Sequence, residues 1–154
     1  MTAPTPSDTP VVLYDTTLRD GTQGENITLS LADKLRVARM LDEFGMPFIE
    51  GGWPGSNPKD IEFFATARTM RWERARLAAF GSTRHRANKP GNDPNLSELV
   101  AAETPVVTLF GKSWLLHVPV VLGAPPAENL ATVAASVGFL VDRGRDATYH
   151  PGHS

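Results

Sequence analysis

The chain has 154 residues, 41% of them apolar, with a formal net charge of −2 at pH 7 and a pI near 6.1. This length and composition suffice for one ordinary domain with a packed core. The basic residues are scattered along the chain, which argues against a nucleic-acid partner. No apolar run is long enough to span a bilayer, so no membrane partner is expected. The absence of cysteine excludes disulfides and thiolate metal sites, and it fits a cytoplasmic protein.

Apolar strands and amphipathic helices are predicted to alternate along the chain. Residues 1–10, rich in proline and threonine, predict a disordered tail. A strand over 11–15 follows, and then a helix over 31–44 with Ser30 and Asp33 as a capping box. Further strands are predicted at 48–50, 76–80, 105–110 and 147–149, and further helices begin at Pro58, at Pro94 and at Pro126, the last one ending before Gly144.

The apolar spacing predicts which helix faces are buried. On helix 31–44 the expected face is Leu31, Leu35, Ala38, Leu41 and Phe44. On the helix that begins at Pro126 it is Leu130, Val133, Ala134, Val137 and Leu140. The segment 114–122 is ambiguous, and Pro119 is expected to disrupt any helix there.

This alternation favours βαβ units and parallel strands, with a repeat of about 30 residues. Two α/β architectures satisfy that pattern, a doubly wound sheet and a (β/α)8 barrel. Composition and periodicity leave both open.

The most informative motif is Asp15-Thr16-Thr17-Leu18-Arg19-Asp20-Gly21-Thr22-Gln23, directly after the first predicted strand. It places an arginine, two carboxylates and an amide at the exit of a strand. Charged groups in such a place need partners, because burying them alone is costly. The arrangement suits a divalent metal ion and an anionic substrate.

The motif resembles the first-strand signature of the metal-dependent acyl-CoA condensing enzymes and lyases, the 2-isopropylmalate synthase and homocitrate synthase superfamily. The segments IEGGWPGSNPKD at 49–60 and TLFGKSW at 108–114 are most similar to its citramalate synthase branch. The resemblance covers residues 11–149 and implies a TIM barrel. A whole barrel needs roughly 250 residues. We therefore expect the N-terminal half of a (β/α)8 TIM barrel at 11–149, truncated near the fifth strand, with a divergent tail at 150–154.

The implied activity is an acyl transfer that condenses acetyl-CoA with a 2-oxo acid. In this branch the oxo acid is pyruvate and the product is (R)-citramalate, for isoleucine biosynthesis. A sister enzyme that uses 2-oxoisovalerate for leucine biosynthesis is the alternative. The resemblance also implies self-association into a homo-oligomer.

The resemblance assigns roles to two residues, and three more receive expected roles from their positions. Asp20 matches the metal-binding aspartate, with Mg²⁺ or Mn²⁺ favoured and Zn²⁺ or Co²⁺ as alternatives. Arg19 matches the arginine that binds substrate and stabilises enolate or alkoxide charge. Gln23 is the expected neutral donor beside the metal, and Glu50 is expected to orient Arg19 or to contact substrate. His85, in the basic loop after the third strand, is expected to meet CoA phosphates or the oxo-acid carboxylate.

Each assignment has a purely structural alternative. Asp20 could cap the turn at Gly21, and Arg19 could form an ion pair with Asp15 or Glu50. Gln23 could be a solvated loop residue, and the loop of His85 could be a solvated basic loop. A loop of this composition is most often solvated, and strand-end carboxylates often pair with a nearby arginine.

The expected metal site is incomplete in this sequence. The family completes it with a His-x-His pair on a late strand, and the chain contains no His-x-His. The H-x-x-H pair of His150 and His153 lies in a Pro-Gly segment that holds no fixed geometry. We therefore expect little or no activity from this chain alone, and a non-catalytic half barrel that needs a partner chain is the alternative of another class.

Overall fold

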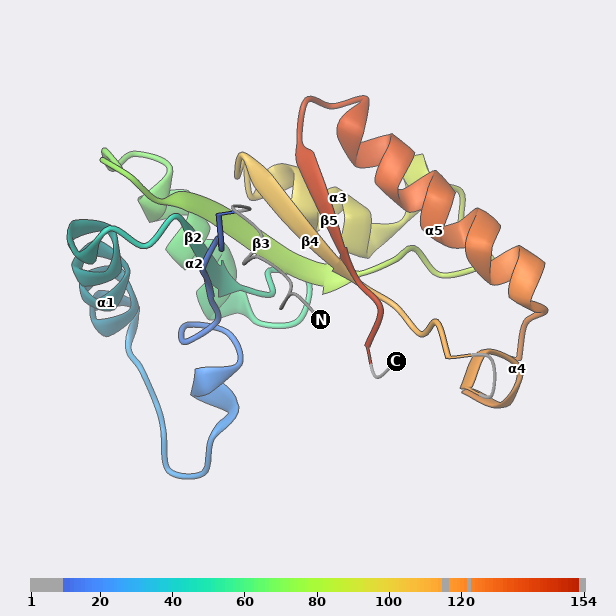
Figure 1. The fold of residues 1–154 in the computed structure, drawn as a ribbon, viewed down its shortest axis with the longest axis horizontal. Coiled ribbons are helices and arrows are strands. Elements are labelled where there is room, and N and C mark those ends of the chain that lie inside the picture. The colour runs from blue at the N-terminus through green and yellow to red at the C-terminus, as the bar shows by residue number, and fades with distance from the viewer. Residues whose placement is uncertain (1–9, 115–116, 122, 153–154) are drawn as a thin grey trace, which may run out of the picture.

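The computed structural model describes residues 10–114, 117–121 and 123–152. Five parallel strands form one sheet, and helical segments connect them (Figure 1). The strands are β1 (Tyr14–Asp15), β2 (Phe48–Gly52), β3 (Arg76–Ser82), β4 (Val106–Phe110) and β5 (Asp146–His150). The helices are α1 (Leu31–Phe44), α2 (Pro58–Ala67), α3 (Pro94–Ala101), α4 (His117–Val121) and α5 (Pro126–Val141), with short 3-10 turns η1 (Gly21–Gln23) and η2 (Pro90–Asn92).

The strand order decides between the two architectures that the sequence left open. The strands lie side by side in the order β1-β2-β3-β4-β5, with no reversal. A doubly wound sheet reverses its strand order at a switch point, whereas a (β/α)8 barrel adds each strand to the same side. The prediction of half a TIM barrel is therefore confirmed.

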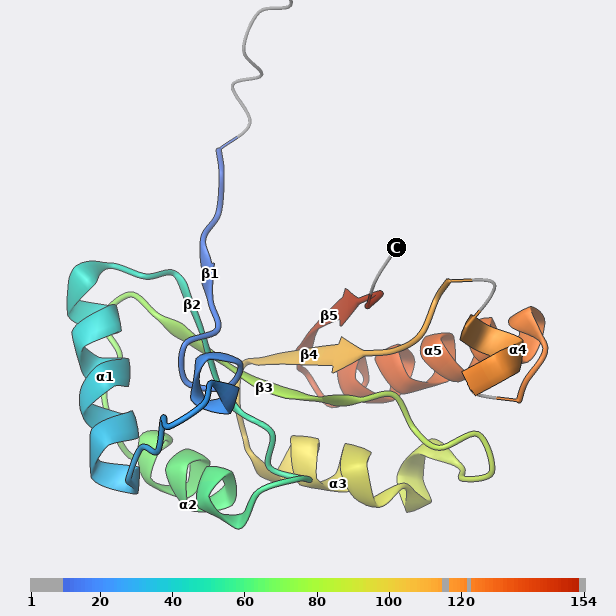
Figure 2. The same cartoon turned by 90° about the horizontal axis from the view of Figure 1, so that it is seen from below.

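The helices lie along one face of the curved sheet, and the core fills the space between them (Figure 2). Alternate strand residues point into that core, since neighbouring side chains of a strand lie on opposite faces. The strand residues of the core include Ile49, Leu77, Ala79, Val107 and Leu109, and the helix residues include Phe63, Phe64, Leu96, Leu99 and Leu140. The next residue along β2, β3 and β4 therefore points to the face away from the helices.

Side chains cap the first three helices directly before the positions where the sequence predicts each helix to begin. Ser30 and Asp33 form the expected capping box at α1. Asn57 accepts a hydrogen bond from the backbone N–H of Lys59 at the start of α2, and Asp93 accepts one from Leu96 at the start of α3. These caps fix where each strand-to-helix loop ends, and so they fix the loops that carry the polar residues.

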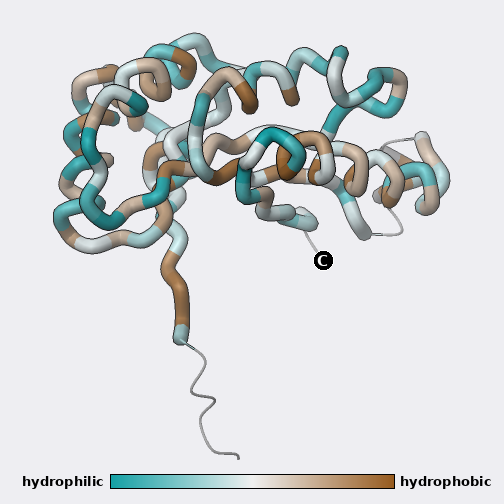
Figure 3. Tube along the Cα trace, turned by 90° about the horizontal axis from the view of Figure 1, so that it is seen from above, coloured by the Kyte–Doolittle hydropathy of each residue, from teal (hydrophilic) through white to brown (hydrophobic). Residues whose placement is uncertain are grey.

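The first strand is shorter than predicted. Residues 11–13 lie outside β1, and Val11 is 87% exposed. Figure 3 shows this apolar stretch standing away from the rest of the chain. The reason is register: Tyr14 pairs with Phe48, the first residue of β2, so residues 11–13 have no partner in that strand.

Two predicted helix faces are partly wrong. Phe44 is 80% exposed and Leu130 is 69% exposed, although both were expected in the core. Polar residues take buried places on the same helices instead: Lys34 and Asp42 on α1, and Thr132 and Ser136 on α5. The side chains of Lys34, Asp42 and Ser136 have hydrogen-bonding partners inside the fold, so their burial is tolerated.

The expectation that Pro119 disrupts a helix is also wrong. Pro119 is the third residue of the short helix α4. In the first turn of a helix the backbone N–H has no intrahelical partner, so a proline loses no hydrogen bond there. Across the described residues, no helix is both long and apolar enough to cross a membrane.

Candidate functional site

Four side chains meet on the face of the sheet away from the helices. We call them the strand-mouth cluster: Tyr14 of β1, Arg19 of the following loop, Glu50 of β2 and Thr108 of β4. Parallel strands deliver their carboxyl ends to one edge of a sheet, which is where (β/α)8 enzymes carry their sites. The sequence separates Tyr14 from Thr108 by 94 residues, and the fold brings their hydroxyls to 2.6 Å.

Glu50 is the centre of this cluster and is only 1% exposed. Its Oε1 accepts a hydrogen bond from Nε of Arg19 at 2.5 Å, and its Oε2 accepts one from the hydroxyl of Tyr14 at 2.6 Å. The guanidinium carbon of Arg19 also lies 4.0 Å from the centroid of the Phe80 ring. An ion pair on one side and a cation–π contact on the other hold the guanidinium in one place.

The loop that carries Arg19 is a tight turn. The Asp15 carboxylate accepts hydrogen bonds from the backbone N–H and the hydroxyl of Thr17, each at 3.0 Å. The carbonyl of Thr16 accepts the backbone N–H of Asp20 at 2.8 Å. Leu18 is fully buried and anchors the turn in the core. Asp15 therefore shapes the turn, and the turn presents Arg19 beside β2.

Asp20 lies next to Arg19, with its Oδ1 3.0 Å from a terminal guanidinium nitrogen. Its side chain is 61% exposed, so the carboxylate remains open to a ligand. Gln23 follows in η1, and its backbone N–H donates to the Asp20 carbonyl at 2.9 Å. The turn therefore brings a hard carboxylate donor and an amide side chain to the same loop.

The donors of this loop match part of the divalent metal site that the family resemblance implies. A carboxylate oxygen is the ligand type that Mg²⁺ and Mn²⁺ prefer. Within the described ranges, however, no group of three or more His, Asp or Glu side chains could hold a metal ion. Asp20 therefore fits as one ligand of such a site, and the described residues do not complete the set.

The environment of Tyr14 affects its ionisation. Burial raises the pKa of its hydroxyl well above the ordinary value, and the hydrogen bond to the Glu50 carboxylate raises it further. Tyr14 therefore stays a neutral donor to Glu50 throughout the physiological pH range. Its ring also stacks on Phe48, which fixes the side chain at the first paired position of β1 and β2.

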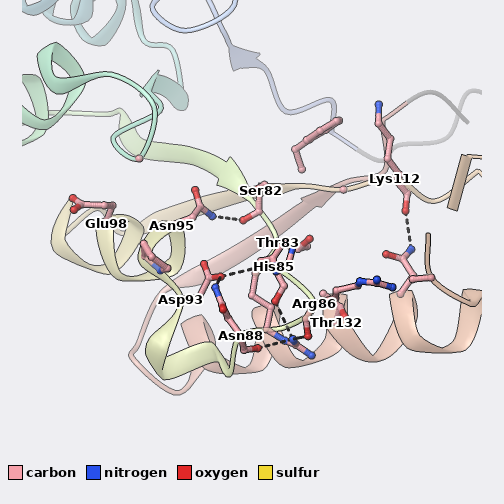
Figure 4. Close-up of a pocket in the computed structure, with 17 residues that line it drawn as sticks. Ser82, Thr83, His85, Arg86, Asn88, Asp93, Asn95, Glu98, Lys112 and Thr132 are labelled. Carbon is pink, nitrogen blue, oxygen red and sulfur yellow. Dashed lines mark hydrogen bonds between the residues drawn. The ribbon is translucent and has the colours of Figure 1, made fainter. Parts of the chain in front are cut away.

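A cavity of about 790 Å³ lies at the carboxyl ends of β3 and β4. Its walls are the loop after β3, the residues that follow β4, and the beginnings of α3 and α5 (Figure 4). We call it the loop cavity. His85 lines it, so the structure divides the predicted site residues between two places.

Asp93 organises the loop that forms one wall of the cavity. It is 2% exposed, and it accepts hydrogen bonds from the His85 backbone, the Asn88 side chain and the Leu96 backbone, at 2.9, 2.9 and 3.1 Å. Burial alone would raise the pKa of the Asp93 carboxyl, but these hydrogen bonds outweigh it and hold the pKa below its ordinary value. The ionised carboxylate is therefore part of the folded loop.

Arginine side chains complete the loop. One terminal nitrogen of Arg84 donates to the carbonyls of His85, Arg86 and Asn88, at 3.2, 2.9 and 2.7 Å. Arg86 donates to the carbonyl of Gly123 at 2.7 Å and so ties the loop to the segment before α5. Both guanidinium groups meet neutral carbonyls here, which leaves their charge uncompensated.

An aromatic pair separates the strand-mouth cluster from the loop cavity. The ring of Phe80 lies beneath Arg19, and the ring of Phe110 lines the cavity. The two ring centroids are 6.2 Å apart. The sites are therefore neighbours along one edge of the sheet, joined by an apolar surface.

Sequence reasoning singled out Arg19 and Glu50 and gave an ion pair of Arg19 with Asp15 or Glu50 as the structural alternative, and the structure has the pair with Glu50. It did not single out Tyr14, Thr108 or Phe80. A signal was available for Tyr14, because it immediately precedes the motif at the end of an apolar run. For Thr108 no local signal exists, because its contact depends on how far β4 curves toward β1.

The fold and these sites define a class: half of a (β/α)8 barrel with a polar site at the carboxyl ends of its strands. The chain belongs to the HMGL-like family, whose model matches residues 10–153. It is 52% identical over 130 residues to the (R)-citramalate synthase of Aquifex aeolicus, covering 84% of this chain and 25% of that protein. The (R)-citramalate synthase of Synechocystis is 50% identical over 141 residues, covering 92% and 26%.

More distant relatives carry a different name. The 2-isopropylmalate synthase of Saccharolobus solfataricus is 30% identical over 139 residues, covering 90% of this chain and 34% of that protein. The crystal structure of hydroxymethylglutaryl-CoA lyase from Pseudomonas aeruginosa superposes with a TM-score of 0.67 at 19% identity, covering 90% of this chain and 45% of that one. The Bacillus subtilis HMG-CoA lyase gives 0.66 at 17%. The chain spans about a quarter of the length of the citramalate synthases that it matches.

Proposed function

We propose that this chain supplies the first five strands of the catalytic barrel of a citramalate synthase, which condenses acetyl-CoA with pyruvate to give (R)-citramalate. The observation that carries the proposal is the fixed Arg19 guanidinium beside the exposed Asp20 carboxylate at the strand mouth. Sequence identity supports pyruvate as the oxo acid. This chain is about 50% identical to the citramalate synthases and 30% or less identical to the 2-isopropylmalate synthases.

The reaction creates negative charge that needs a positioned partner. A base removes a proton from the acetyl methyl, the enolate carbon attacks the ketone carbon of the oxo acid, and an alkoxide forms. Hydrolysis of the thioester then releases CoA. Arg19, held by Glu50 and Phe80, offers N–H donors in a fixed orientation where that charge develops. Among the described residues of this chain, none is assigned as the base or as the group that hydrolyses the thioester.

The same proposal includes a divalent metal, with Asp20 as one ligand. When bound, such an ion would polarise the ketone of the oxo acid as a Lewis acid. Mg²⁺ or Mn²⁺ suits a carboxylate ligand, and Zn²⁺ or Co²⁺ suits a site that adds imidazoles. Gln23 is proposed as a neutral donor beside Asp20. Glu50 is proposed to act through Arg19, because both of its oxygens are already engaged.

A chimaera tests the proposal. Residues 10–150 of this chain would replace the matching segment of the Aquifex aeolicus (R)-citramalate synthase, and pyruvate-dependent release of free CoA thiol would be measured with Mn²⁺. The chimaera should turn over, and Asp20→Asn should reduce turnover roughly 100-fold or more, as loss of a metal contact does. The matched control is Asp146→Asn, a carboxylate at the other end of the sheet, which should leave turnover unchanged.

The substrate range separates the alternatives. Turnover with 2-oxoisovalerate but not with pyruvate would favour the 2-isopropylmalate synthase reaction. A folded chimaera that is inactive with both oxo acids would favour a non-catalytic half barrel. Unchanged turnover in Asp20→Asn would remove the metal assignment.

A further inference from the structure

A buried ion pair lies beneath the loop that follows β2. Lys34 of α1 and Asp60 of α2 are 3% and 5% exposed, and the Lys34 ammonium donates a hydrogen bond to Oδ1 of Asp60. The ammonium also lies 5.2 Å from the centroid of the Phe63 ring. Because both charges lose their water, such a pair adds little net stability compared with an apolar pair. Its clearest structural effect is to hold the Asp60 carboxylate in one orientation.

The Asp60 carboxylate fixes the first residue after β2. Its Oδ2 accepts the backbone N–H of Trp53 at 2.8 Å. A Cβ atom at Gly52 would collide with this carboxylate, so only glycine allows the backbone and the carboxylate to approach so closely. The chain therefore leaves β2 along a defined path, and the Trp53 side chain starts from a fixed point.

The indole of Trp53 reaches the next strand and the next helix. Its Nε1–H donates to Oδ1 of Asn95 in α3 at 3.0 Å, and the Asn95 amide nitrogen donates to the carbonyl of Ser82 at 2.5 Å (Figure 4). The indole also packs edge-to-face against the ring of Phe80, with ring centroids 5.5 Å apart and ring planes at 80°. Trp53 is thus held at its backbone and at its indole nitrogen while it contacts Phe80.

The ring of Phe80 is shared between Trp53 and Arg19. The guanidinium carbon of Arg19 lies 4.0 Å from the Phe80 ring centroid. A cation–π contact requires the cation to lie over the face of the ring, so it depends on how the ring is oriented. The edge-to-face contact with Trp53 favours one orientation of that ring. The hydrogen bond to Glu50 holds Nε of Arg19, and the plane of the Phe80 ring directs the rest of the guanidinium.

We infer that Trp53 is a positioning residue for Arg19: acting through the Phe80 ring, it limits the directions in which the guanidinium can point. Its relevance to catalysis rests on the proposed function, in which Arg19 stabilises the negative charge that develops in the reaction. The positioning itself is a property of the folded chain, so it can be measured without turnover.

NMR of the Arg19 Nε–H group in the 154-residue chain tests the inference. Trp53→Leu should shift this signal and speed the exchange of its proton with water about 3-fold or more, the factor expected from the loss of one aromatic pair. Trp53→Phe keeps a ring against Phe80, so it should restore most of the wild-type behaviour. The matched control is Trp72→Leu, because the Trp72 indole donates to the carbonyl of Ala67, in the segment before β3. That variant should leave the Arg19 signal unchanged, even where it lowers stability.

A milder variant tests the same contact without removing the indole. Gly55→Ala would place a Cβ atom 3.4 Å from Nε1 of Trp53 and 3.1 Å from Oδ1 of Asn95, which is close enough to displace the indole. It should move the Arg19 signal in the same direction as Trp53→Leu, by a smaller amount. An unchanged Arg19 signal in folded Trp53→Leu overturns the inference. If Trp53→Leu does not fold, an unchanged signal in Gly55→Ala overturns it. Equal changes in Trp53→Leu and Trp72→Leu would also overturn it, because they would reflect only a general loss of stability.

Turnover of the chimaera tests the consequence for catalysis. Trp53→Leu should lower kcat roughly 10-fold, because small displacements of a catalytic group are costly, whereas Trp72→Leu should leave kcat unchanged. An unchanged kcat for Trp53→Leu in an active chimaera would overturn the catalytic part of the inference. An inactive chimaera in which Trp53→Leu still moves the Arg19 signal would count against the condensation reaction alone. The positioning role and the proposed function can therefore fail separately.

Discussion

The strand-mouth cluster and the loop cavity stand side by side at one edge of the sheet, but they are built differently. The cluster joins side chains to side chains across three strands, through Tyr14, Glu50 and Thr108. The cavity is shaped by side chains that bind backbone groups within one loop, through Asp93 and Arg84. The first arrangement fixes the direction of a guanidinium, and the second fixes the path of a loop and leaves cations facing the cavity. Contacts between distant strands and contacts within one loop are thus separated along the sheet edge.

The largest expected effect comes from breaking the ion pair of the cluster. Glu50→Gln leaves the mostly buried Arg19 without its carboxylate, and we expect the free energy of unfolding to fall by about 3 kcal/mol in a urea titration. The control is Glu103→Gln, whose partner Arg68 is exposed, and there the loss should be below about 1 kcal/mol. Equal losses in the two variants would show that Glu50 does not anchor the cluster.

A somewhat smaller effect is expected from the centre of the cavity loop. Asp93→Ala removes the cap of α3 and the acceptor for the His85 and Asn88 donors, so unfolding should become easier by about 2 kcal/mol. Amide exchange at His85 and Leu96 should accelerate, while the Nε–H signal of Arg19 stays where it is. A change in the Arg19 signal would mean that the two regions are not independent.

A finer test concerns the hydroxyl pair within the cluster. Tyr14→Phe leaves Glu50 with one unpaired oxygen and should reduce the free energy of unfolding by about 1 kcal/mol. Thr108→Val should cost a similar amount. Because both changes break the same contact, the double variant should be less destabilised than the sum by about 0.5 kcal/mol or more. Additive losses would indicate that the 2.6 Å contact contributes no coupling.

Acid should destabilise the loop of Asp93, and alkali should destabilise the cluster of Tyr14. Both effects on the free energy of unfolding should be small. Hydrogen bonds hold the pKa of Asp93 below its ordinary value despite burial, so its contribution to stability is present above about pH 4 and declines as the pH falls further. Burial and Glu50 raise the pKa of Tyr14, so its contribution is present below about pH 10 and is lost as the pH rises.

Absorbance at 295 nm measures the alkaline limb directly. The chain has two tyrosines, and burial raises the pKa of Tyr149 as well. The folded chain should therefore show less tyrosinate at about pH 10 than the unfolded chain, in which a tyrosine is half ionised at that pH. A normal titration curve for both tyrosines, with circular dichroism unchanged, would contradict the buried setting of Tyr14.

Much of this fold follows from local signals, and the failures share one cause. Caps at Ser30, Asn57 and Asp93 are readable because they depend on a few adjacent residues. The burial of Lys34 and Asp42 is not readable from apolar spacing, because their partners lie 26 or more residues away. The Asp42 carboxylate accepts three backbone N–H groups of the loop before β3. A polar residue in the core is intelligible only once its distant partner is known.

The candidate site divides in the same way. Arg19 and Asp20 were singled out because they lie in one continuous motif, and Glu50 because it ends the strand predicted at 48–50. The cavity was foreseen only as a basic loop around His85, since its walls come from segments on either side of β4. The resemblance to a known family indicated which chemistry to expect from these residues. The structure gave the distances between them.

The contact between Tyr14 and Thr108 has a geometric consequence. In a flat sheet, three steps between neighbouring strands would separate β1 from β4 by about 14 Å. Their hydroxyls nevertheless touch, with the Glu50 carboxylate between the two strands as a second link. This hydrogen bond joins β1 to β4 directly across the concave face of the sheet. The curvature of a closed barrel is therefore already present between these strands, and contacts between their own side chains support it.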